Sequence, residues 1–486
     1  MTISLKDNSL FKTQGYIDGQ WVNADDGSTF AVTNPATGEE IAQVANLGAV
    51  ETKRAIDASA AAMDAWKALP AKERCAILEK WNDLLLANQE DLAVILTTEQ
   101  GKTLAEARGE IAYGASYIKW FAEEGKRVYG DILPSPSDRR SLVIKQPIGV
   151  VAAITPWNFP NGMITRKAAP ALAVGCAMVL KPAAETPLSA LALAELAERA
   201  GLPKGLFNVV PGLDAPAIGG ELTSNKTVKK LTFTGSTPIG KLLMKQCADT
   251  GKRTSMELGG NAPVIVFEDA DIDLAVQGAL AAKYRNSGQT CICANRIMVQ
   301  ENIYDEFVKR FAQHVDQFSI GNGLEDGTTH GPVITEKAIS GIHEKVENAV
   351  AQGAKVITGG KISDKGAQFY EPTILTNVDD TMSVFSEEIF GPVAPIFKFK
   401  TEEQAIAMAN DTDFGLAAYF YTENMGRIFR VGEGLQYGMV GVNETAISSE
   451  MIPFGGVKES GQGREGSKYG LDDYLEIKYL CVGGLN

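Results

Sequence analysis

The sequence predicts an α/β protein built around parallel sheets. Its 486 residues exceed what one ordinary hydrophobic core organises, so we expect about three structural units. The 45% of hydrophobic and 22% of charged residues are typical of a soluble globular protein. From about residue 143 onward, short apolar runs alternate with helical patterns, which indicates strand and helix units with helices on both faces of a sheet.

The first part of the chain is predicted to be helical. Apolar residues that include Leu78, Trp81 and Leu85 recur at three- and four-residue spacing, the period of a helix with one buried face. Similar patterns lie near residues 50–68 and 104–127. A parallel sheet is expected to follow, with strands at residues 150–154, 177–180, 207–210 and 230–234 and a helix at 188–200.

A second series begins after Gly259 and Gly260, where we expect a domain boundary. It has strand patterns at residues 263–267 and 297–299, and helical patterns from residue 272, at 303–317 and at 335–352. Two further segments, 141–145 and 474–481, alternate apolar and polar residues as strands with one wet face do. Because exposed edge strands invite pairing, we expect them to contribute to a homo-oligomer, a dimer or a tetramer.

Charge and composition exclude several classes of function. A net charge of −14 disfavours nucleic-acid binding, because the phosphate backbone would be repelled. The first 21 residues lack the pattern of an export signal, and the longest apolar stretch, 168–180, is too short to span a membrane. Six cysteines and three histidines show no disulfide or zinc spacing, so we expect no metal and a reducing, cytoplasmic location.

Three turns that follow predicted strands are candidates for a ligand site, at residues 155–160, 181–187 and 235–240. The carboxyl ends of parallel strands meet at one edge of a sheet, so these turns should gather there. In the third, Gly235 and Ser236 lead into a helix whose first amides can hold a phosphate or lie beside a nicotinamide. The full Gly-x-Gly-x-x-Gly fingerprint is absent, so a capped helix without a ligand is the alternative.

Cys291 is the candidate nucleophile. It follows a glycine-containing turn, where a substrate can approach closely and nearby amides can lower the pKa of the thiol. The alternative is an inert cysteine that fills the core. Glu257 precedes two glycines at a predicted strand end, which is a poor place for a solvated surface charge.

Six motifs resemble the aldehyde dehydrogenase superfamily, in the family's order and over nearly the whole chain. They are PWNFP (156–160), KPA with TP (181–187), FTGS (233–236), ELGG (257–260), GQTC (288–291) and EEIFGPV (387–393). The resemblance implies a Rossmann-like cofactor domain, an α/β catalytic domain and a small β oligomerisation arm. We expect them to cover, in that order, residues 1–127 with 148–258, residues 259–453, and residues 128–147 with 470–486.

The resemblance also implies roles for individual residues. Cys291 would be the nucleophile, Glu257 the general base and Asn158 the donor to the oxyanion. Cys291 would add to an aldehyde, hydride would pass to a nicotinamide, and Glu257 would activate water to hydrolyse the thioester. The implied cofactor contacts are Lys181 at the adenine ribose, Trp157 and Ser236 near the pyrophosphate, Gly235 beside the nicotinamide, and Glu388 with Phe390 at its ribose.

Within the superfamily, succinate semialdehyde dehydrogenases are the most similar group. The runs that carry this similarity are MITRKAAPAL (163–172), KYRNSGQTCICAN (283–295) and GREGSKYGLDDYLEIKY (463–479). The similarity implies oxidation of succinate semialdehyde, with its carboxylate held by Arg166, Arg285 and Ser449. Surface ion pairs are the alternative for the two arginines. Glutarate semialdehyde is an alternative substrate, because one methylene changes discrimination by only about 1–3 kcal/mol.

Ala184, three residues after Lys181, bears on the choice of cofactor. Similar enzymes that prefer NAD carry a glutamate there, which would repel the 2′-phosphate of NADP. Two features count against NADP: enzymes that prefer it tend to carry serine at this position, and the adjacent Glu185 adds an unfavourable charge. Because the glutamate that would repel the 2′-phosphate is absent, the sequence favours NADP and leaves NAD open.

Two alternatives to a dehydrogenase remain at this point. A thiol hydrolase or transferase could use Cys291 without hydride transfer, although no histidine lies beside the motif. A non-catalytic relative would be expected to lack the nucleophile or the base, and both are present. Cys293 is either a small buried residue or a second thiol that forms a reversible disulfide with oxidised Cys291.

Overall fold

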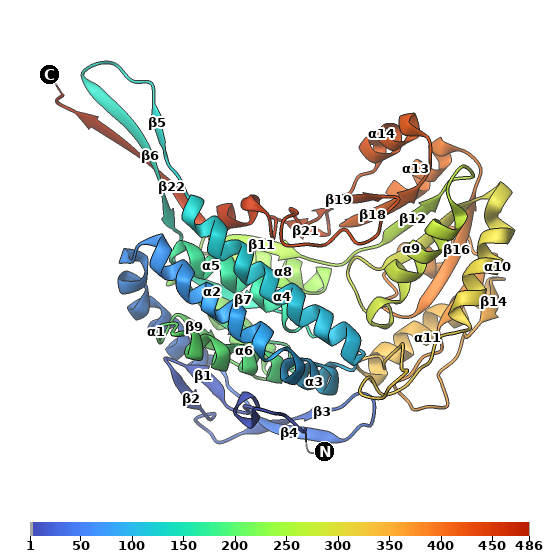
Figure 1. Ribbon diagram of the computed structural model, residues 1–486, viewed down its shortest axis with the longest axis horizontal. Coiled ribbons are helices and arrows are strands. Elements are labelled where there is room, and N and C mark those ends of the chain that lie inside the picture. The colour runs from blue at the N-terminus through green and yellow to red at the C-terminus, as the bar shows by residue number, and fades with distance from the viewer. Residues whose placement is uncertain (1–2, 486) are drawn as a thin grey trace.

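Two sheets with different strand orders organise the computed structural model, which describes residues 3–485 (Figure 1). Residues 1, 2 and 486, at the ends of two predicted domain ranges, lie outside the described residues. One sheet has eight strands and the other has seven. The apolar side chains beside the first sheet form one buried cluster, and those beside the second sheet form two. The division into domains near residue 259 remains a prediction that these separate clusters support.

The first sheet has a parallel centre in the order β9-β8-β7-β10-β11. Its strands are β7 (Val150–Ile154), β8 (Ala177–Lys181), β9 (Phe207–Val209), β10 (Val228–Thr234) and β11 (Arg253–Glu257). The four strands predicted in this region are confirmed, and β11 is an addition. Antiparallel edge strands complete the sheet: β1 (Gly15–Ile17), β2 (Gln20–Val22) and, from far along the chain, β21 (Gly461–Gln462).

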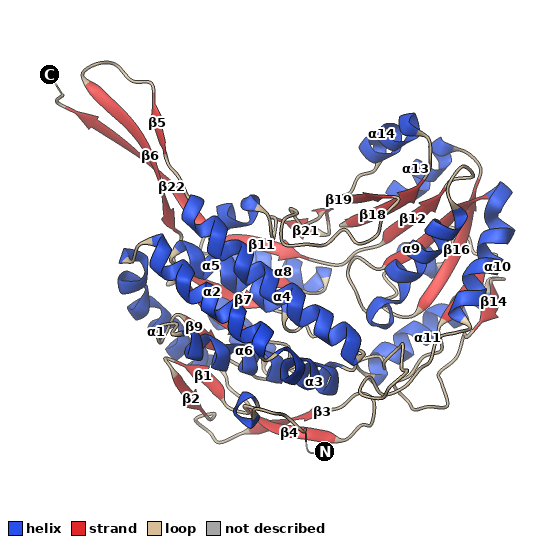
Figure 2. Ribbon diagram, viewed as in Figure 1, coloured by secondary structure: helices blue, strands red, loops and turns tan. Residues whose placement is uncertain are grey.

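Helices pack around the first sheet, with α2, α4 and α5 stacked together in the foreground of Figure 2. The helices are α1 (Ala49–Ala68), α2 (Ala71–Ala87), α3 (Gln89–Gln100), α4 (Leu104–Glu124), α5 (Gly162–Val174), α6 (Pro187–Ala200), α7 (Ala215–Ser224) and α8 (Thr237–Ala248). The predicted apolar face is confirmed, because Leu78, Trp81 and Leu85 of α2 are almost completely buried. Trp81 packs against Phe207 of β9 with 5.8 Å between the ring centres.

The second sheet follows the order β14-β15-β16-β13-β12-β18-β19 and is parallel except for β14. Its strands are β12 (Ala262–Val266), β13 (Ala294–Gln300), β14 (Lys355–Thr358), β15 (Thr373–Thr376), β16 (Val393–Phe399), β18 (Ala417–Tyr421) and β19 (Met439–Val442). The accompanying helices are α9 (Ile272–Tyr284), α10 (Tyr304–Val315), α11 (Glu336–Ala351), α12 (Ser383–Ser386), α13 (Glu402–Asn410) and α14 (Met425–Gly434). The predicted strands and the helices α9, α10 and α11 are confirmed.

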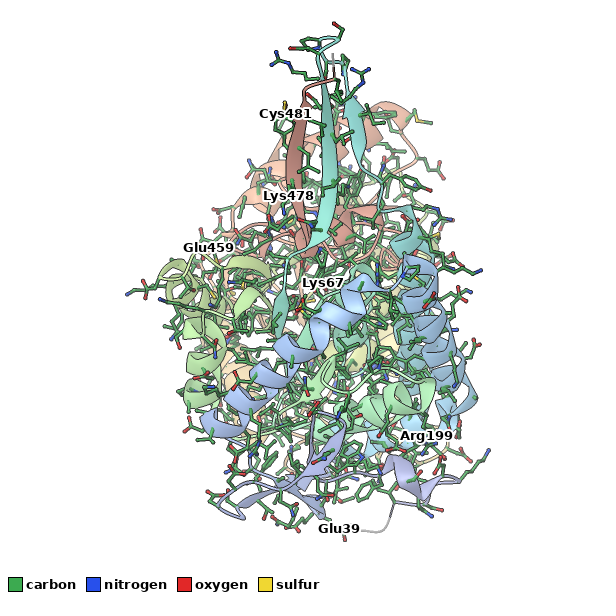
Figure 3. The ribbon with its side chains drawn as sticks, turned by 90° about the vertical axis from the view of Figure 1, so that its left-hand side faces the viewer. Glu39, Lys67, Arg199, Glu459, Lys478 and Cys481 are labelled. Atoms are coloured by element: carbon green, nitrogen blue, oxygen red, sulfur yellow. The ribbon has the colours of Figure 1, made fainter. Side chains whose placement is uncertain are left out.

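A three-stranded antiparallel arm projects from the body and carries Lys478 and Cys481 (Figure 3). It consists of β5 (Asp131–Leu133), β6 (Arg139–Pro147) and β22 (Leu475–Gly483), of which β6 and β22 were predicted as shorter strands. Ile132 and Ile477 expose 77% and 72% of their surface. Such exposure of large apolar side chains is typical of a contact surface, and the predicted homo-oligomer remains a prediction.

The described residues contain no helix with the length and apolarity needed to cross a membrane. All six cysteines are unpaired. Within residues 3–485, no group of three or more His, Cys, Asp or Glu side chains is placed to hold a metal ion.

Candidate active site

The strand order of the first sheet reverses direction between β7 and β10, and ligands of open α/β sheets bind at such a point. The turn after β7 carries Trp157 and Asn158, and the turn after β10 carries Gly235 and Ser236. These two turns line the same cavity, as the sequence predicted. Ser236 is the N-cap of α8, and its side chain makes no capping hydrogen bond, so the first amides of the helix face the turn.

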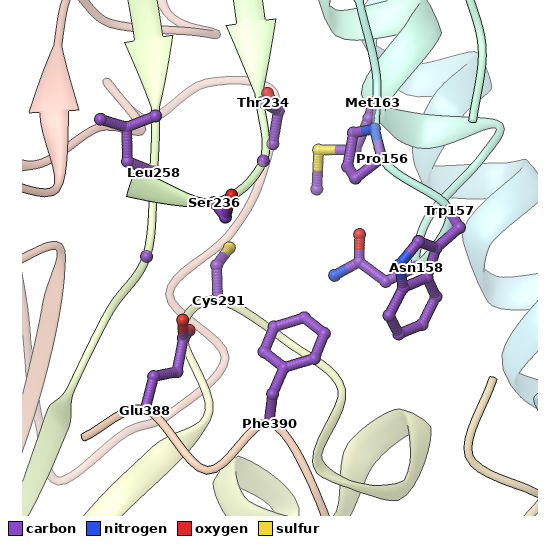
Figure 4. A pocket seen from close by; sticks show the side chains of 12 residues that line it. Pro156, Trp157, Asn158, Met163, Thr234, Ser236, Leu258, Cys291, Glu388 and Phe390 are labelled. Carbon is purple, nitrogen blue, oxygen red and sulfur yellow. The ribbon is translucent and has the colours of Figure 1, made fainter. Parts of the chain in front are cut away.

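The cavity has a volume of about 240 Å³, and Cys291 lies in its wall (Figure 4). We refer to it as the wide hollow. Its lining residues are Pro156, Trp157, Asn158, Met163, Thr234, Gly235, Ser236, Leu258, Gly259, Cys291, Glu388 and Phe390. Besides Cys291, six of the other predicted catalytic and cofactor residues line this one space, namely Trp157, Asn158, Gly235, Ser236, Glu388 and Phe390.

Several features of the wide hollow suit the nicotinamide and phosphate part of a dinucleotide. The hydroxyl oxygen of Thr234 is buried and has no hydrogen-bond partner among the described residues, which leaves it available to a ligand. Phe390 and Trp157 meet edge to face with ring centres 5.6 Å apart, which gives an apolar wall. Burial raises the pKa of Glu388 to about 7, although the Gly260 amide donates to its carboxylate. The free helix start at Ser236 is a favourable place for phosphate.

Lys181 and Ala184 lie away from this lining. Lys181 is the last residue of β8 and is mostly buried, and this burial lowers the pKa of its ammonium group while Glu185 opposes the effect. Ala184 is half-buried and packs against the core beside the first sheet, whereas Glu185 is exposed. Both Lys181 and Ala184 therefore lie at the carboxyl end of β8, where the sequence predicted them.

The loop that carries Cys291 has an unusual backbone. Asn286 and Ser287 have φ values of 50° and 54°, and Gly288 has a φ of 77°. A Cβ atom at Gly288 would lie 2.2 Å from the carbonyl oxygen of Gly391, so only glycine fits there. Such left-handed conformations persist only where the surroundings hold them. The side chain of Asn286 provides part of that support, since it donates to the carbonyl oxygen of Asn158 at 3.1 Å.

The thiol of Cys291 has a pKa raised to about 12. Burial is the largest cause, and the nearby carboxylate of Glu257 adds to it, whereas Arg166 opposes it. We predicted that backbone amides lower this pKa. A backbone hydrogen bond does act in that direction, but its effect is smaller than that of burial, so the predicted net direction is wrong.

Asn158 is buried and directed into the wide hollow (Figure 4). Its side-chain nitrogen donates to the carbonyl oxygen of Gln289 at 3.0 Å, and its backbone oxygen accepts from Lys102 at 2.8 Å. Lys102 is itself paired with Glu110 at 2.6 Å, so a buried ion pair supports the turn from behind. An amide held this firmly is preorganised to donate to a negative oxygen near Cys291.

Glu257 ends β11 and is almost completely buried. Its Oε2 atom has no hydrogen-bond partner among the described residues. Burial raises the pKa of this carboxyl well above its usual value, and Glu465 raises it further, while Arg166 and Lys167 oppose the shift. A solvated surface role for Glu257 is therefore excluded.

A second, smaller space of about 20 Å³ lies on another side of Cys291. We refer to it as the narrow hollow. Its lining residues are Tyr113, Phe159, Met163, Arg166, Arg285, Thr290, Cys291, Ile292, Ser448 and Phe454. Both predicted arginines line it, and Cys291 and Met163 line both hollows. Ser449 is not among its lining residues, and the neighbouring Ser448 is.

The two arginines differ in their partners. Arg166 is almost completely buried and forms an ion pair with Glu465 at 2.7 Å, with its guanidinium over the ring of Phe454 at 4.0 Å. Arg285 is exposed, lies 4.9 Å from the ring centre of Phe159, and has no ion-pair or side-chain hydrogen-bond partner within residues 3–485. The alternative of ion pairing therefore holds for Arg166, although it is buried rather than at the surface.

Several residues of the site were not predicted from the sequence. Tyr113 of α4 lies in the narrow hollow, where its hydroxyl group and the Ser448 hydroxyl are 2.6 Å apart. Glu465 contacts both Arg166 and Lys167. Glu465 lies in one of the segments that resemble succinate semialdehyde dehydrogenases, but no pattern near it predicts a buried carboxylate. Tyr113 lies in an ordinary amphipathic helix, where no local signal distinguishes it.

Cys293 is buried and lines neither hollow. Its Sγ atom donates to the carbonyl oxygen of Lys283 at 3.2 Å. The predicted disulfide between Cys293 and Cys291 remains a prediction, and the two thiols are free here.

Known proteins resemble this chain over its full length. A model of the aldehyde dehydrogenase family matches residues 21–480. A glutarate-semialdehyde dehydrogenase of Pseudomonas aeruginosa is 61% identical over 99% of this chain and 100% of its own. The NADP(+) succinate-semialdehyde dehydrogenase GabD of Escherichia coli is 59% identical over the same shares. The crystal structure of a succinate-semialdehyde dehydrogenase from Burkholderia pseudomallei has a TM-score of 0.98 at 58% identity, covering 99% of this chain and 100% of its own.

Proposed function

Because the chain belongs to the aldehyde dehydrogenase family, we propose that it oxidises succinate semialdehyde to succinate with a nicotinamide cofactor. The observation that carries this proposal is the position of Cys291, which lines both the wide and the narrow hollow. An aldehyde held in the narrow hollow would then meet the nucleophile next to the cofactor space. The family assignment leaves little support for a thiol hydrolase without hydride transfer.

In this proposal the Cys291 sulfur adds to the aldehyde carbon and forms a thiohemiacetal. The negative oxygen is held by the side-chain amide of Asn158 and the backbone amide of Cys291. Asn158 is suited to this because the Lys102 contact fixes its backbone. When bound, the oxidised nicotinamide supplies the hydride acceptor and a positive charge that favours the thiolate. The residues that would hold it are Trp157, Lys181, Gly235, Ser236, Glu388 and Phe390.

After oxidation, Cys291 carries the acyl group as a thioester, and Glu257 acts as the base for its hydrolysis. A carboxylate with a raised pKa is a stronger base toward water than an ordinary surface glutamate. The proton that Glu257 removes stays within a buried group of charges, where Glu465 and Lys167 lie.

We assign the substrate carboxylate chiefly to Arg285. Its guanidinium has no ion-pair or side-chain hydrogen-bond partner among the described residues, so a carboxylate would gain a full charge-assisted pair. Arg166 contributes less, because its guanidinium already forms an ion pair with Glu465. The hydroxyl groups of Tyr113 and Ser448 add donors, and Ser449 lies one residue beyond. Glutarate semialdehyde is the second candidate, because a relative with that name is 61% identical.

For the cofactor we favour NADP over NAD. At position 184 an alanine replaces the carboxylate that would repel the 2′-phosphate of NADP. Lys181, at the end of β8, places a positive charge three residues away, where it would attract that phosphate. The name of the Escherichia coli relative, which includes NADP(+), is in agreement. We also propose that the protein forms a homo-oligomer, a dimer or a tetramer, through the arm. We propose a cytoplasmic location.

Steady-state kinetics with a panel of aldehydes and both cofactors test this function. We expect succinate semialdehyde with NADP to give the highest kcat/KM, followed by glutarate semialdehyde, with uncharged aldehydes well below. A higher kcat/KM for an uncharged aldehyde of the same length would contradict the substrate assignment.

A further inference from the structure

Asn295, in β13, is a buried polar side chain that the catalytic proposal does not use. Its Nδ2 atom donates to the backbone oxygen of Glu387 at 2.9 Å, and its Oδ1 atom accepts from the backbone amide of Ile389 at 2.9 Å. Only this orientation of the side-chain amide gives each backbone group a suitable partner. The two backbone groups lie on either side of Glu388, so Asn295 holds the chain before and after it.

The segment that carries Glu388 has no regular structure of its own. Residues 387–392 lie between α12 and β16 and belong to neither a helix nor a strand, so their backbone groups need partners from elsewhere. Phe390 has a φ of 51°, and a bulky residue keeps such a conformation only where its surroundings hold it. Glu388 and Phe390 both line the wide hollow with Cys291 (Figure 4). Their placement there therefore depends on contacts from other elements.

A second asparagine extends these contacts toward the loop after β11. The Nδ2 atom of Asn295 also donates to Oδ1 of Asn261 at 2.6 Å. Asn261 is buried, and its own Nδ2 atom donates to the backbone oxygen of Phe385 at 2.9 Å. The amide of the preceding Gly260 donates to the carboxylate of Glu388 at 3.2 Å. The backbone around Glu388 and its carboxylate are thus held from the same side.

We propose that Asn295 is a positioning residue for the cofactor, because it holds Glu388 where its carboxylate can bind the nicotinamide ribose. This inference rests on the proposed function, in which Glu388 makes that contact. The Asn295 amide is neutral and its contacts in the segment are with backbone groups, so it acts on the position of Glu388. Cys291 lies just before β13, so one short stretch of chain would fix both the nucleophile and the residue that orients the hydride acceptor.

Asn295→Ala tests the inference in the full-length protein. Calorimetry gives the Kd for NADP, and rapid mixing with succinate semialdehyde gives the rate at which reduced cofactor forms in the first turnover. We expect the Kd to rise and this rate to fall, each about tenfold, because buried hydrogen bonds are lost and the carboxylate shifts. The ratio of kcat/KM for succinate semialdehyde to that for an uncharged aldehyde should stay as in the parent, since the narrow hollow is untouched.

Asn208→Ala is the matched control for the loss of a buried asparagine. Asn208 of β9 is also buried, donates to the backbone oxygen of Gly205 at 2.8 Å and accepts from the backbone amide of Asp18 at 2.9 Å. It lines neither hollow. We expect a similar loss of thermal stability with the Kd and first-turnover rate of the parent. Equal changes in Kd and rate in both variants would overturn the proposal, because Asn295 would then act only through stability.

A double-mutant cycle with Glu388→Ala shows whether Asn295 acts through Glu388. In the Glu388→Ala background, Asn295→Ala should change the Kd for NADP about threefold or less, and a full tenfold change would overturn the proposal. If Asn295→Ala does not fold, Asn295→Ser, which keeps a small polar group, replaces it in the same cycle and decides. Glu388→Ala alone separates the two proposals. Parent affinity in this variant would contradict the role of Glu388, whereas weak binding beside a parent-like Asn295→Ala would contradict only the role of Asn295.

Discussion

The two hollows that meet at Cys291 are built in different ways. The wide hollow is lined mainly by turns that follow the parallel strands β7 and β10, each with its own local motif. The narrow hollow is assembled from α4, α5, the loop before β13 and the segment around Ser448, which lie far apart in the chain. A ligand site on sheet turns therefore carries signals in the local sequence. A pocket between helices depends on tertiary packing.

The largest expected effect is the loss of the residue that both hollows share. Cys291→Ala should abolish aldehyde oxidation, because no thiohemiacetal or thioester can form. Binding of the nicotinamide cofactor, measured by calorimetry, should remain close to that of the parent, since the turns of the wide hollow are untouched. Aldehyde oxidation near the parent rate would refute the assignment of the nucleophile.

Substitutions of the two arginines should affect the narrow hollow differently, because only Arg166 has an ion-pair partner among the described residues. Arg285→Ala should lower kcat/KM for succinate semialdehyde about tenfold or more relative to an uncharged aldehyde of the same length, because a charge-assisted partner is lost. Arg166→Ala should lower thermal stability more than Arg285→Ala, because it removes a buried partner of Glu465. Arg285→Lys, which keeps the charge but not the planar fork, should fall between. Equal losses on both aldehydes in Arg285→Ala would contradict its role.

A change on the side of the wide hollow should alter the cofactor and leave the aldehyde preference as it is. Ala184→Glu should shift the ratio of kcat/KM values toward NAD, about tenfold or less, because its carboxylate would repel a 2′-phosphate. Ala184→Gln is the matched control, since it has the same length without the charge. An unchanged ratio in Ala184→Glu would show that the 2′-phosphate is recognised elsewhere.

The last expected effect is on stability rather than on catalysis, and it concerns pH and the support of the turn after β8. Glu99 is buried and accepts the amides of Leu188 and Ser189 at the start of α6, and burial raises the pKa of its carboxyl from 4.5 to about 8. Because the folded state binds this proton more tightly, the free energy of unfolding should fall as pH rises from about 4.5 through about 8. The loss would be at most about 5 kcal/mol.

Denaturation curves of the parent and Glu99→Gln between these pH values check this expectation. The variant cannot ionise at position 99, so its stability relative to the parent should increase with pH. A difference between the two proteins that stays constant over this range would show that Glu99 does not titrate there.

Much of the fold could be predicted because buried parallel strands and amphipathic helices have clear periods. β7 and α2 are examples, with continuous apolar or regularly spaced apolar residues. β21 has only two residues, and it pairs with β11 from a distant part of the chain. Such a long-range pairing leaves no pattern in the local sequence. β5 is fully exposed and therefore lacks an alternating pattern.

The site divides in the same way. Gly235, Ser236 and Cys291 were found because each lies in a turn with its own signal. Glu465 was not predicted because its role depends on its ion pairs with Lys167 and Arg166. These partners are far away in the sequence, and 298 residues separate Glu465 from Lys167. The direction of the pKa of Cys291 was also missed, since it depends on burial and on Glu257 rather than on the local turn.

The most direct test of the account is to trap the thioester that links oxidation at Cys291 to hydrolysis by Glu257. Glu257→Gln, mixed with succinate semialdehyde and NADP, should release reduced cofactor in one burst and then stall. Intact-mass spectrometry should find the protein heavier by one succinyl group, on Cys291, and Cys291→Ala should show none. Continued turnover at the parent rate with no acyl adduct on Cys291 would contradict the account.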